Sequence, residues 1–329
     1  MGIFIGGSVV EEIAGLIRLY KNGHVERLPA VPQVSTAYAP EPTVATRDVI
    51  ICHSSVLWAR VYAPRKPNPN NPPHRLLPVL LYFHGGGFCV GSPAWRCYHE
   101  FLSRLAAAVG CVVVSSSYRL APEHRLPAAY EDGEAALTWL LGQQSGRAGP
   151  DREGFNWRSM CDFGRIFVAG DSAGAAIAYA VGGRDCVRGL ILLQPFFGGE
   201  TRTESELAGS PSKSVLSLAV SDCYWRMALP MECDRNHPWC NPMGPTAKEV
   251  TTRVPAAILV CVAELDILKD RNVEFCGSLR RAGKNVRLVT YEGVGHAFQI
   301  LHNYHSSDVR TAEMLSDIKA FVNAAVPTN

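Results

Sequence analysis

The sequence lacks the features that direct a protein to a membrane, to secretion or to nucleic acid. None of its apolar runs approaches the roughly 20 residues that span a bilayer, and it contains no Asn-x-Ser/Thr sequon. Its 32 Lys and Arg residues are nearly balanced by 30 Asp and Glu residues and do not cluster. We therefore expect neither a membrane nor a nucleic acid as partner, because phosphate backbones are bound by clustered cations.

The amino terminus also has little that resembles a targeting signal. Met1 to Val10 is apolar but short, has no basic start and leads directly into Glu11 and Glu12. Gly2 would suit myristoylation, but Gly6 stands where that motif needs Ser or Thr. The 11 cysteines are odd in number and mostly lie in apolar contexts, which is typical of reduced thiols. We predict a cytoplasmic or nuclear location, and a monomer or weak homodimer.

What the sequence does contain is the composition of a globular protein. Hydrophobic residues make up 47% of the 329 residues and charged residues 19%, a balance that fills a large core. Mixed α/β chains of this length often form one unit. We therefore predict a single domain with an inserted subregion.

Short apolar runs alternate with helical patterns through most of the chain. Runs that are apolar on both faces are typical of parallel strands covered by helices on both sides, so the alternation predicts an α/β fold with a mainly parallel sheet. Strands are expected at Val56–Tyr62, Val79–Phe83, Cys111–Val114, Ile166–Ala169, Leu190–Leu193, Ala257–Val262 and Val286–Tyr291. Helices are expected at Tyr98–Val109, Pro127–Leu141, Ala173–Ala180, Asp270–Ala282 and Asp308–Val322.

Three segments depart from this alternation. Val9 to Tyr20 carries apolar residues at helical spacing before Asn22-Gly23, which predicts a short helix. Pro64 to Pro73 is a Pro/Asn tract and predicts a surface loop. Residues 201–250 are rich in Pro, Trp and Cys and predict an inserted cap, with a helix around Ser214 to Ala228.

The segment Gly170-Asp171-Ser172-Ala173-Gly174 carries the strongest chemical signal. It follows a predicted strand and precedes a predicted helix, which is the context of a G-x-S-x-G nucleophile turn. Glycines at both flanks let neighbouring backbones approach, and the helix amino terminus favours developing negative charge. We predict Ser172 as a nucleophile; the alternative is a Gly-Ser turn that matches by chance.

A second glycine segment, His84-Gly85-Gly86-Gly87, directly follows another predicted strand. Its N–H groups can approach an ester carbonyl without a side chain in the way. We therefore predict an oxyanion hole made by Gly85, Gly86 and Gly87 together with Ala173. A phosphate-binding loop is the competing interpretation. It is disfavoured because no Gly-Lys-Ser/Thr follows and the glycine spacing does not match G-x-G-x-x-G.

A serine hydroxyl needs an imidazole to take its proton and a carboxylate to orient that imidazole. Asp266 follows one predicted strand, and His296 follows the next. Both stand at carboxyl ends of strands, where open α/β sheets gather their reactive groups. We predict Asp266 as the acid and His296 as the base. The rivals are Glu264 and Asp270 for the acid, and His302 and His305 for the base.

A metal site is the remaining chemical alternative. Cys233, His237 and Cys240 are close in sequence, but no fourth ligand stands at suitable spacing. We therefore interpret them as cap packing and expect no metal and no organic cofactor.

Aromatic residues near these motifs are candidates for the wall of a substrate pocket. Pockets for small molecules are mainly apolar, and aromatic side chains supply large contact areas. The alternative for each is a place in the core. The predicted substrate-binding residues are Phe88, Phe196, Phe197, Tyr224 and Trp225.

Taken together, these motifs resemble those of plant carboxylesterases of the hormone-sensitive-lipase-like branch. The resemblance covers nearly the whole chain, and several motifs occur in the right order. It rests on His84–Phe88, Tyr118–Glu123, Gly170–Gly174, Asp266–Asp270 and Gly295–Phe298, and on Lys21–Arg27 and Tyr224–Pro230.

The resemblance implies an α/β-hydrolase fold with an eight-stranded sheet and an N-terminal lid, here residues 1–45. It implies hydrolysis of small or medium acyl esters, with the small-molecule ester as partner. Gibberellin receptors resemble these esterases, so ligand binding with little turnover is the alternative, but those receptors lack the triad histidine and this chain keeps His296. Relatives recruited to alkaloid cyclisation tend to lose parts of the triad, which disfavours that third class.

Two departures from the family pattern concern the helix after Ser172. Ala175-Ala176 stand where Gly-Asn is usual, and the segment Tyr179 to Arg188 is shorter than usual. We expect a truncated helix and weaker support for Ser172, with low activity as a consequence.

Overall fold

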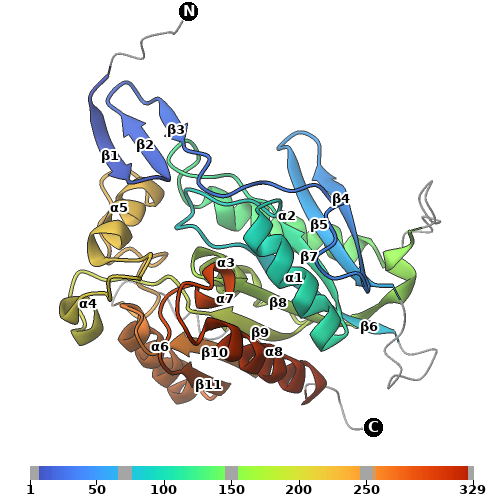
Figure 1. The fold of residues 1–329 in the computed structure, drawn as a ribbon. Coiled ribbons are helices and arrows are strands. Elements are labelled where there is room, and N and C mark those ends of the chain that lie inside the picture. Colours follow the sequence, from blue (N-terminus) through green and yellow to red (C-terminus); the bar gives the residue numbers. More distant parts are fainter. Residues whose placement is uncertain (1–6, 66–75, 145–154, 245–254, 256, 325–329) are drawn as a thin grey trace, which may run out of the picture.

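The protein is built around one eight-stranded sheet (Figure 1). The computed structural model describes residues 7–65, 76–144, 155–244, 255 and 257–324. β6 to β11 run parallel, whereas β5 is antiparallel to its neighbours β4 and β7. The predicted, mainly parallel α/β-hydrolase sheet is confirmed. In spatial order the strands are β11 (Asn285–Tyr291), β10 (Ala257–Ala263), β9 (Val187–Leu193), β8 (Cys161–Asp171), β6 (Leu77–Phe83), β7 (Val112–Ser116), β5 (Leu57–Pro64) and β4 (Val44–Cys52).

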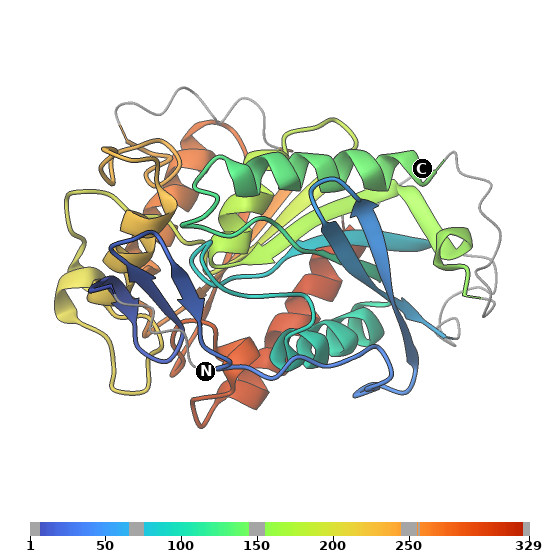
Figure 2. The same ribbon diagram turned by 90° about the horizontal axis from the view of Figure 1, so that it is seen from above.

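Helices cover both faces of this sheet (Figure 2). One face packs against α1 (Arg96–Val109) and α8 (Ser307–Ala324). The other packs against α2 (Ala128–Gly142), α3 (Ala173–Val181) and α6 (Lys269–Arg281). Every residue of β6 is buried, which explains why its sequence is apolar without alternation. Within the described ranges, no helix has the length and apolar character to cross a bilayer.

The observed elements include each strand and helix predicted for the core, with ends that differ by a few residues. β8, for example, begins at Cys161 and not at Ile166. β4, the 3₁₀ helix η1 (Trp157–Met160) and the short helix α7 (Phe298–Leu301) were not predicted. Of the predicted Pro64–Pro73 loop, residues 66–73 lie outside the described residues. α3 has nine residues.

The predicted helix over Val9–Tyr20 is wrong. The segment forms β1 (Val9–Ile13) and β2 (Ile17–Tyr20), which join β3 (Val25–Arg27) in an antiparallel sheet. Gly15, at φ +75°, lies in the turn, and Ile13 pairs with Ile17. A tight hairpin therefore places two residues four positions apart on one face, as a helix would. The β-branched composition of the segment decides for the strands.

The described residues between β9 and β10 form two helices, α4 (Glu204–Ala208) and α5 (Leu218–Ala228). Thr203 and Glu206 form a capping box at the start of α4, and Ser217 caps α5 by accepting a hydrogen bond from the Val220 N–H. The N-terminal sheet lies against α5 (Figure 1).

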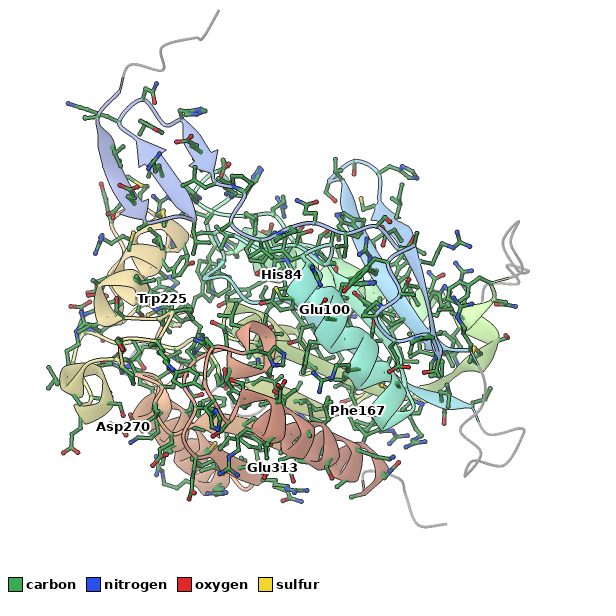
Figure 3. The ribbon with its side chains drawn as sticks, in the orientation of Figure 1. His84, Glu100, Phe167, Trp225, Asp270 and Glu313 are labelled. Atoms are coloured by element: carbon green, nitrogen blue, oxygen red, sulfur yellow. The ribbon has the colours of Figure 1, made fainter. Side chains whose placement is uncertain are left out.

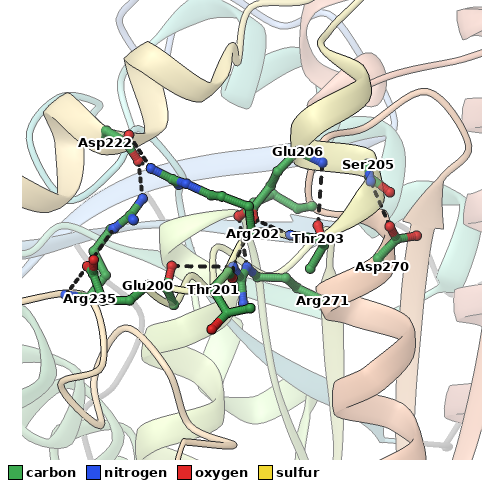
Figure 4. A network of polar contacts seen from close by, with 12 residues as sticks. Glu200, Thr201, Arg202, Thr203, Ser205, Glu206, Asp222, Arg235, Asp270 and Arg271 are labelled. Atoms are coloured by element: carbon green, nitrogen blue, oxygen red, sulfur yellow. Dashed lines mark hydrogen bonds and ion pairs between the residues drawn. The ribbon is translucent and has the colours of Figure 1, made fainter.

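A buried ion pair holds this region to α6 (Figure 4). Arg271 of α6 donates to both carboxylate oxygens of Glu206 in α4, each at 2.8 Å. It also donates to the Thr201 carbonyl at 2.6 Å. The side chains of Arg271 and Glu206 are only 5% and 2% exposed. Nearby, Arg202 and Arg235 both pair with Asp222 of α5.

Glu206→Gln removes one charge of the buried pair and leaves Arg271 without a counterion. We expect the free energy of unfolding to fall by about 3 kcal/mol, measured by chemical denaturation at pH 7. Glu313→Gln breaks the exposed pair between Arg310 and Glu313 and is the matched control, with an expected change below about 0.5 kcal/mol. Equal small changes in both variants would contradict a structural role for the buried pair.

Candidate active site

Ser172 lies in a sharp turn between β8 and α3. Its backbone has φ 52° and ψ −120°, a sparsely populated conformation for a residue with a side chain. The surrounding backbone holds it there: the Ser172 N–H donates to the Leu193 carbonyl at 2.8 Å, and the Phe196 N–H donates to the Ser172 carbonyl at 3.0 Å. The turn matches the predicted nucleophile context.

Two glycines make this turn sterically possible. A Cβ on Gly174 would lie 2.0 Å from the Phe83 carbonyl oxygen, and one on Gly170 would lie 2.3 Å from the carbonyl carbon of Gly174. Because both contacts are to backbone atoms, no rotamer change could relieve them. The glycines therefore let α3 pack directly against the ends of β6 and β8.

The structure brings Ser172, His296 and Asp266 together from three loops at the carboxyl edge of the sheet. His296 Nε2 lies 2.9 Å from Ser172 Oγ, and His296 Nδ1 lies 2.7 Å from Asp266 Oδ2. The other carboxylate oxygen of Asp266 accepts the Leu268 N–H at 3.0 Å. All three side chains are buried. With a proton on Nδ1, the free Nε2 faces the serine hydroxyl.

The rival residues lie elsewhere and have other partners. Glu264 accepts the Gly293 N–H at 2.9 Å, and Asp270 accepts the Ser205 N–H at 2.7 Å. His302 pairs with Asp308 at the surface, and His305 is exposed.

Gln194 supports the histidine loop, and the sequence interpretation missed it. Its side-chain oxygen accepts the N–H of Ala297 at 2.7 Å, and its amide nitrogen donates to Gln299 at 3.2 Å. Ala297 has φ 58°, so this bond holds the residue after His296 in an unfavourable conformation. The available signal was the position of Gln194 directly after the β9 strand, at the same sheet edge as the predicted site.

The glycine segment after β6 divides into two parts. The Gly85 N–H donates to Tyr98 Oη at 2.8 Å and to Asp171 Oδ1 at 3.1 Å. It is therefore not free to act as the oxyanion donor that the sequence predicted. Gly86 and Gly87 line the pocket beside Ser172. Within the part of the chain that the structure describes, the N–H groups of Gly86, Gly87 and Ala173 have no hydrogen-bond acceptor.

Asp171 is a buried carboxylate next to the nucleophile. It accepts hydrogen bonds from Tyr82 at 2.7 Å and Tyr98 at 3.0 Å, besides the Gly85 N–H. Burial raises the pKa of Asp171 to about 6, although the two tyrosine hydroxyls act to lower it. Neither tyrosine was predicted. Tyr82 lies in a buried strand and Tyr98 in a helix, and the sequence pattern of each is that of an ordinary core residue.

His84 is neutral and packs under the glycine segment. Burial lowers the pKa of His84 to about 4, and its ring stacks on Tyr118 with centroids 4.3 Å apart. Tyr118 donates to the His84 carbonyl at 2.8 Å. Figure 3 shows His84 near the centre of the molecule.

An apolar cavity of about 180 Å³ adjoins Ser172 and His296. Of the five predicted aromatic residues, Phe196 and Tyr224 line it. Phe88, Phe197 and Trp225 do not line the cavity and are buried. Trp225, on α5 (Figure 3), stacks on Phe196 with ring centroids 4.6 Å apart, so Phe196 forms part of the wall and Trp225 supports it.

The residues considered for a metal site do not form one. Cys233 is exposed and Cys240 is buried, and His237 packs against the Trp239 ring. Among the described residues, no group of three or more His, Cys, Asp or Glu side chains could hold a metal ion.

The eight-stranded sheet and the strand-turn-helix around Ser172 define the class of α/β hydrolases. The sequence profile of a family described as alpha/beta hydrolase fold matches residues 80–300. The chain therefore belongs to the α/β-hydrolase family, in the branch that holds plant carboxylesterases and gibberellin receptors. The predicted family is confirmed.

Three relatives illustrate this. The chain is 45% identical to probable carboxylesterase 6 of Arabidopsis thaliana over 99% of this chain and 95% of that protein. It is 37% identical to a gibberellin receptor of the same plant over 87% and 82% of the two chains. The structure resembles that of a hyperthermophilic esterase from Pyrobaculum calidifontis, with a TM-score of 0.68 and 30% identity over 85% and 84% of the chains.

Asp171→Asn tests the buried carboxyl group. Its pKa is raised from 3.8 to about 6 in the folded protein, so the folded state holds this proton more tightly than the unfolded state does. Wild type therefore loses stability from this group as the pH rises from about 4 to about 6. Relative to wild type, the variant should gain about 2 kcal/mol of unfolding free energy over that range. Denaturant titrations at pH 4, 5, 6 and 7 measure it, and a difference that does not change with pH would contradict it.

Proposed function

We propose that the protein is a serine carboxylesterase with Ser172 as nucleophile, His296 as general base and Asp266 as orienting acid. The observation that carries the proposal is the continuous contact from Asp266 through His296 to Ser172, at 2.7 and 2.9 Å, beside an apolar cavity. The 45% identity to a carboxylesterase over nearly the full chain supports the same reaction. The substrate is the partner: a small-molecule ester.

Acylation begins when Ser172 Oγ attacks the ester carbonyl carbon while His296 Nε2 takes the hydroxyl proton. Asp266 stabilises the resulting imidazolium and keeps its ring oriented. The tetrahedral intermediate collapses as His296 returns the proton to the leaving alcohol. Water then attacks the acyl-enzyme with His296 again as base, and the carboxylic acid leaves from Ser172.

The oxyanion of each intermediate is held by the N–H groups of Gly86, Gly87 and Ala173. These donors lack acceptors among the described residues, and the Ala173 N–H is one of the unpaired groups at the amino end of α3. Each preorganised donor stabilises the transition state by about 3 kcal/mol. Gly85 serves differently, by fixing the start of the segment through Tyr98 and Asp171.

The cavity favours short, uncharged acyl groups. Its volume of about 180 Å³ is below the roughly 300 to 1,000 Å³ of pockets for drug-sized ligands. Apart from Asp171 and His296, the residues that line it are uncharged, and most are apolar. A small or medium acyl ester fits this chemistry.

The residues that line the cavity support the proposed domain division. We propose one domain over residues 1–329, with residues 1–45 as lid and 201–250 as cap; residues 1–6 and 245–250 of these two segments lie outside the described residues. Leu16 and Val31 of the lid, and Leu216 and Tyr224 of the cap, line the cavity. The protein acts without a metal or organic cofactor, as a monomer or weak homodimer, in the cytoplasm or nucleus.

Ligand sensing is the second candidate, and the 37% identity to a gibberellin receptor favours it. A receptor would bind a small molecule tightly, turn it over little and associate with another protein when loaded. The hydrogen-bonded His296 supports hydrolysis instead, because a pure binding site has no use for a base aligned on a serine.

Ser172→Ala decides between the two functions. We expect turnover of p-nitrophenyl butyrate to fall by about 10⁴-fold or more and labelling by a fluorophosphonate to disappear, because both need the serine oxygen. Ser159→Ala, at an exposed position on η1, is the control and should match wild type. Wild-type turnover no higher than that of Ser172→Ala would remove the hydrolase assignment.

A series of p-nitrophenyl esters tests the acyl-chain preference. We expect kcat/KM to be highest for acyl chains of about two to six carbons and to fall for dodecanoate, because the cavity is small. Leu216→Ala should shift the optimum toward longer chains by enlarging the cavity. Leu207→Ala, in the cap but 70% exposed, should not. An unchanged profile in Leu216→Ala would place the acyl group elsewhere.

A further inference from the structure

One arginine of the N-terminal sheet reaches into the body of the protein. Arg27, at the end of β3, donates through Nε to the Cys89 carbonyl at 2.8 Å and through Nη2 to the Ala121 carbonyl at 2.9 Å. Its two terminal nitrogens also bind the Glu123 carboxylate at 2.6 and 2.7 Å. A single guanidinium thus joins three segments that are far apart in sequence.

Cys89 closes the turn that contains the unpaired glycine N–H groups. The N–H groups of Cys89 and Val90 both donate to the Gly86 carbonyl at 3.0 Å. The Phe88 carbonyl accepts the Ala121 N–H at 2.9 Å. Arg27 therefore fixes both of the chain segments that meet at the far end of this turn, while Tyr98 and Asp171 fix its start at Gly85.

The N-terminal sheet has a separate attachment at its other edge. Glu11 of β1 pairs with Arg226 of the cap helix α5 through two bonds of 2.6 and 2.8 Å, and accepts from the Cys223 thiol at 3.3 Å. Ile13 and Ile17 are buried beneath the sheet. Loss of Arg27 therefore leaves the sheet anchored, and its main consequence falls on the glycine turn.

We propose that Arg27 is a positioning residue for ester hydrolysis, which holds the 86–90 turn so that the Gly86 and Gly87 N–H groups point at the oxyanion. The proposal rests on the proposed function. Arginine suits this place because its planar fork serves two carbonyls and a carboxylate at once, which lysine cannot do. The pair with Glu123 is partly exposed, at 29% and 40%, so its contribution to stability is small. Its contribution is to geometry.

Arg27→Ala, compared with Arg18→Ala, tests the proposal. Arg18 lies on the neighbouring strand β2 and, among the residues that the structure describes, forms ion pairs only with Glu12 and Glu26 of the same sheet, which makes it a matched control. We expect Arg27→Ala to lower kcat for p-nitrophenyl butyrate about tenfold, less than the roughly 10²- to 10³-fold cost of losing an oxyanion donor outright. KM should change less than about threefold, because the displaced donors act mainly on the transition state.

Two further readouts separate positioning from a merely structural role. Fluorophosphonate labelling of Ser172 should slow in parallel with kcat, and the melting temperature should stay close to that of Arg18→Ala. Arg27→Lys should recover part of kcat, and Glu123→Gln, which leaves both carbonyl contacts of Arg27 in place, should lose less than Arg27→Ala. If Arg27→Ala does not fold, the kcat values of Arg27→Lys and Glu123→Gln decide the question.

An unchanged kcat in Arg27→Ala, or a rise in KM alone, would overturn the role of Arg27 while leaving the esterase proposal intact. A wild-type protein without turnover or labelling dependent on Ser172 would overturn the proposed function and the role of Arg27 with it.

Discussion

The direct contact of α3 with the ends of β6 and β8 is the constraint on which the site depends. It forces the chain through a left-handed conformation at Ser172 and excludes any side chain at Gly170 and Gly174. Two hydrogen bonds hold the strained backbone of Ser172 in place: its N–H donates to the Leu193 carbonyl of β9, and its carbonyl accepts the Phe196 N–H. Since the helix starts at Ala173, its unpaired N–H groups lie beside the serine. One close packing contact therefore places the Ser172 hydroxyl beside unpaired N–H groups of the helix.

Buried polar groups around this contact hold the neighbouring loops in place. Asp171 offers its two oxygens to Tyr82, Tyr98 and Gly85, and these three donors offset part of the cost of burying a carboxylate. The raised pKa shows that the offset is incomplete. Gln194 supports the loop that carries His296 in a similar way, because its side-chain oxygen accepts the Ala297 N–H. The arrangement of Ser172, His296 and Asp266 thus depends on hydrogen bonds among loops that follow different strands.

Arginine side chains link the N-terminal sheet and the segment with α4 and α5 to their neighbours. Arg271 joins α4 to α6 in a buried pair, whereas Arg226 and Arg27 contact the N-terminal sheet or its neighbours through more exposed pairs. Exposed pairs add little stability, so the N-terminal sheet depends more on the buried Ile13 and Ile17 for attachment. Sequence reasoning could not find these pairs, because Arg27 and Cys89 are 62 residues apart.

The sequence by itself determined the mainly parallel sheet and the strand-turn-helix around Ser172, because both depend on local patterns of apolar runs and glycines. It did not determine the hairpin of the lid, since Ile13 and Ile17 share a face in either conformation. Only the tertiary structure decided that Gly85 donates inward and that Phe196 lines the cavity while Trp225 does not. Those outcomes depend on contacts between segments that are distant in sequence. A local sequence pattern predicts that an aromatic side chain is buried, but not whether it lines the cavity.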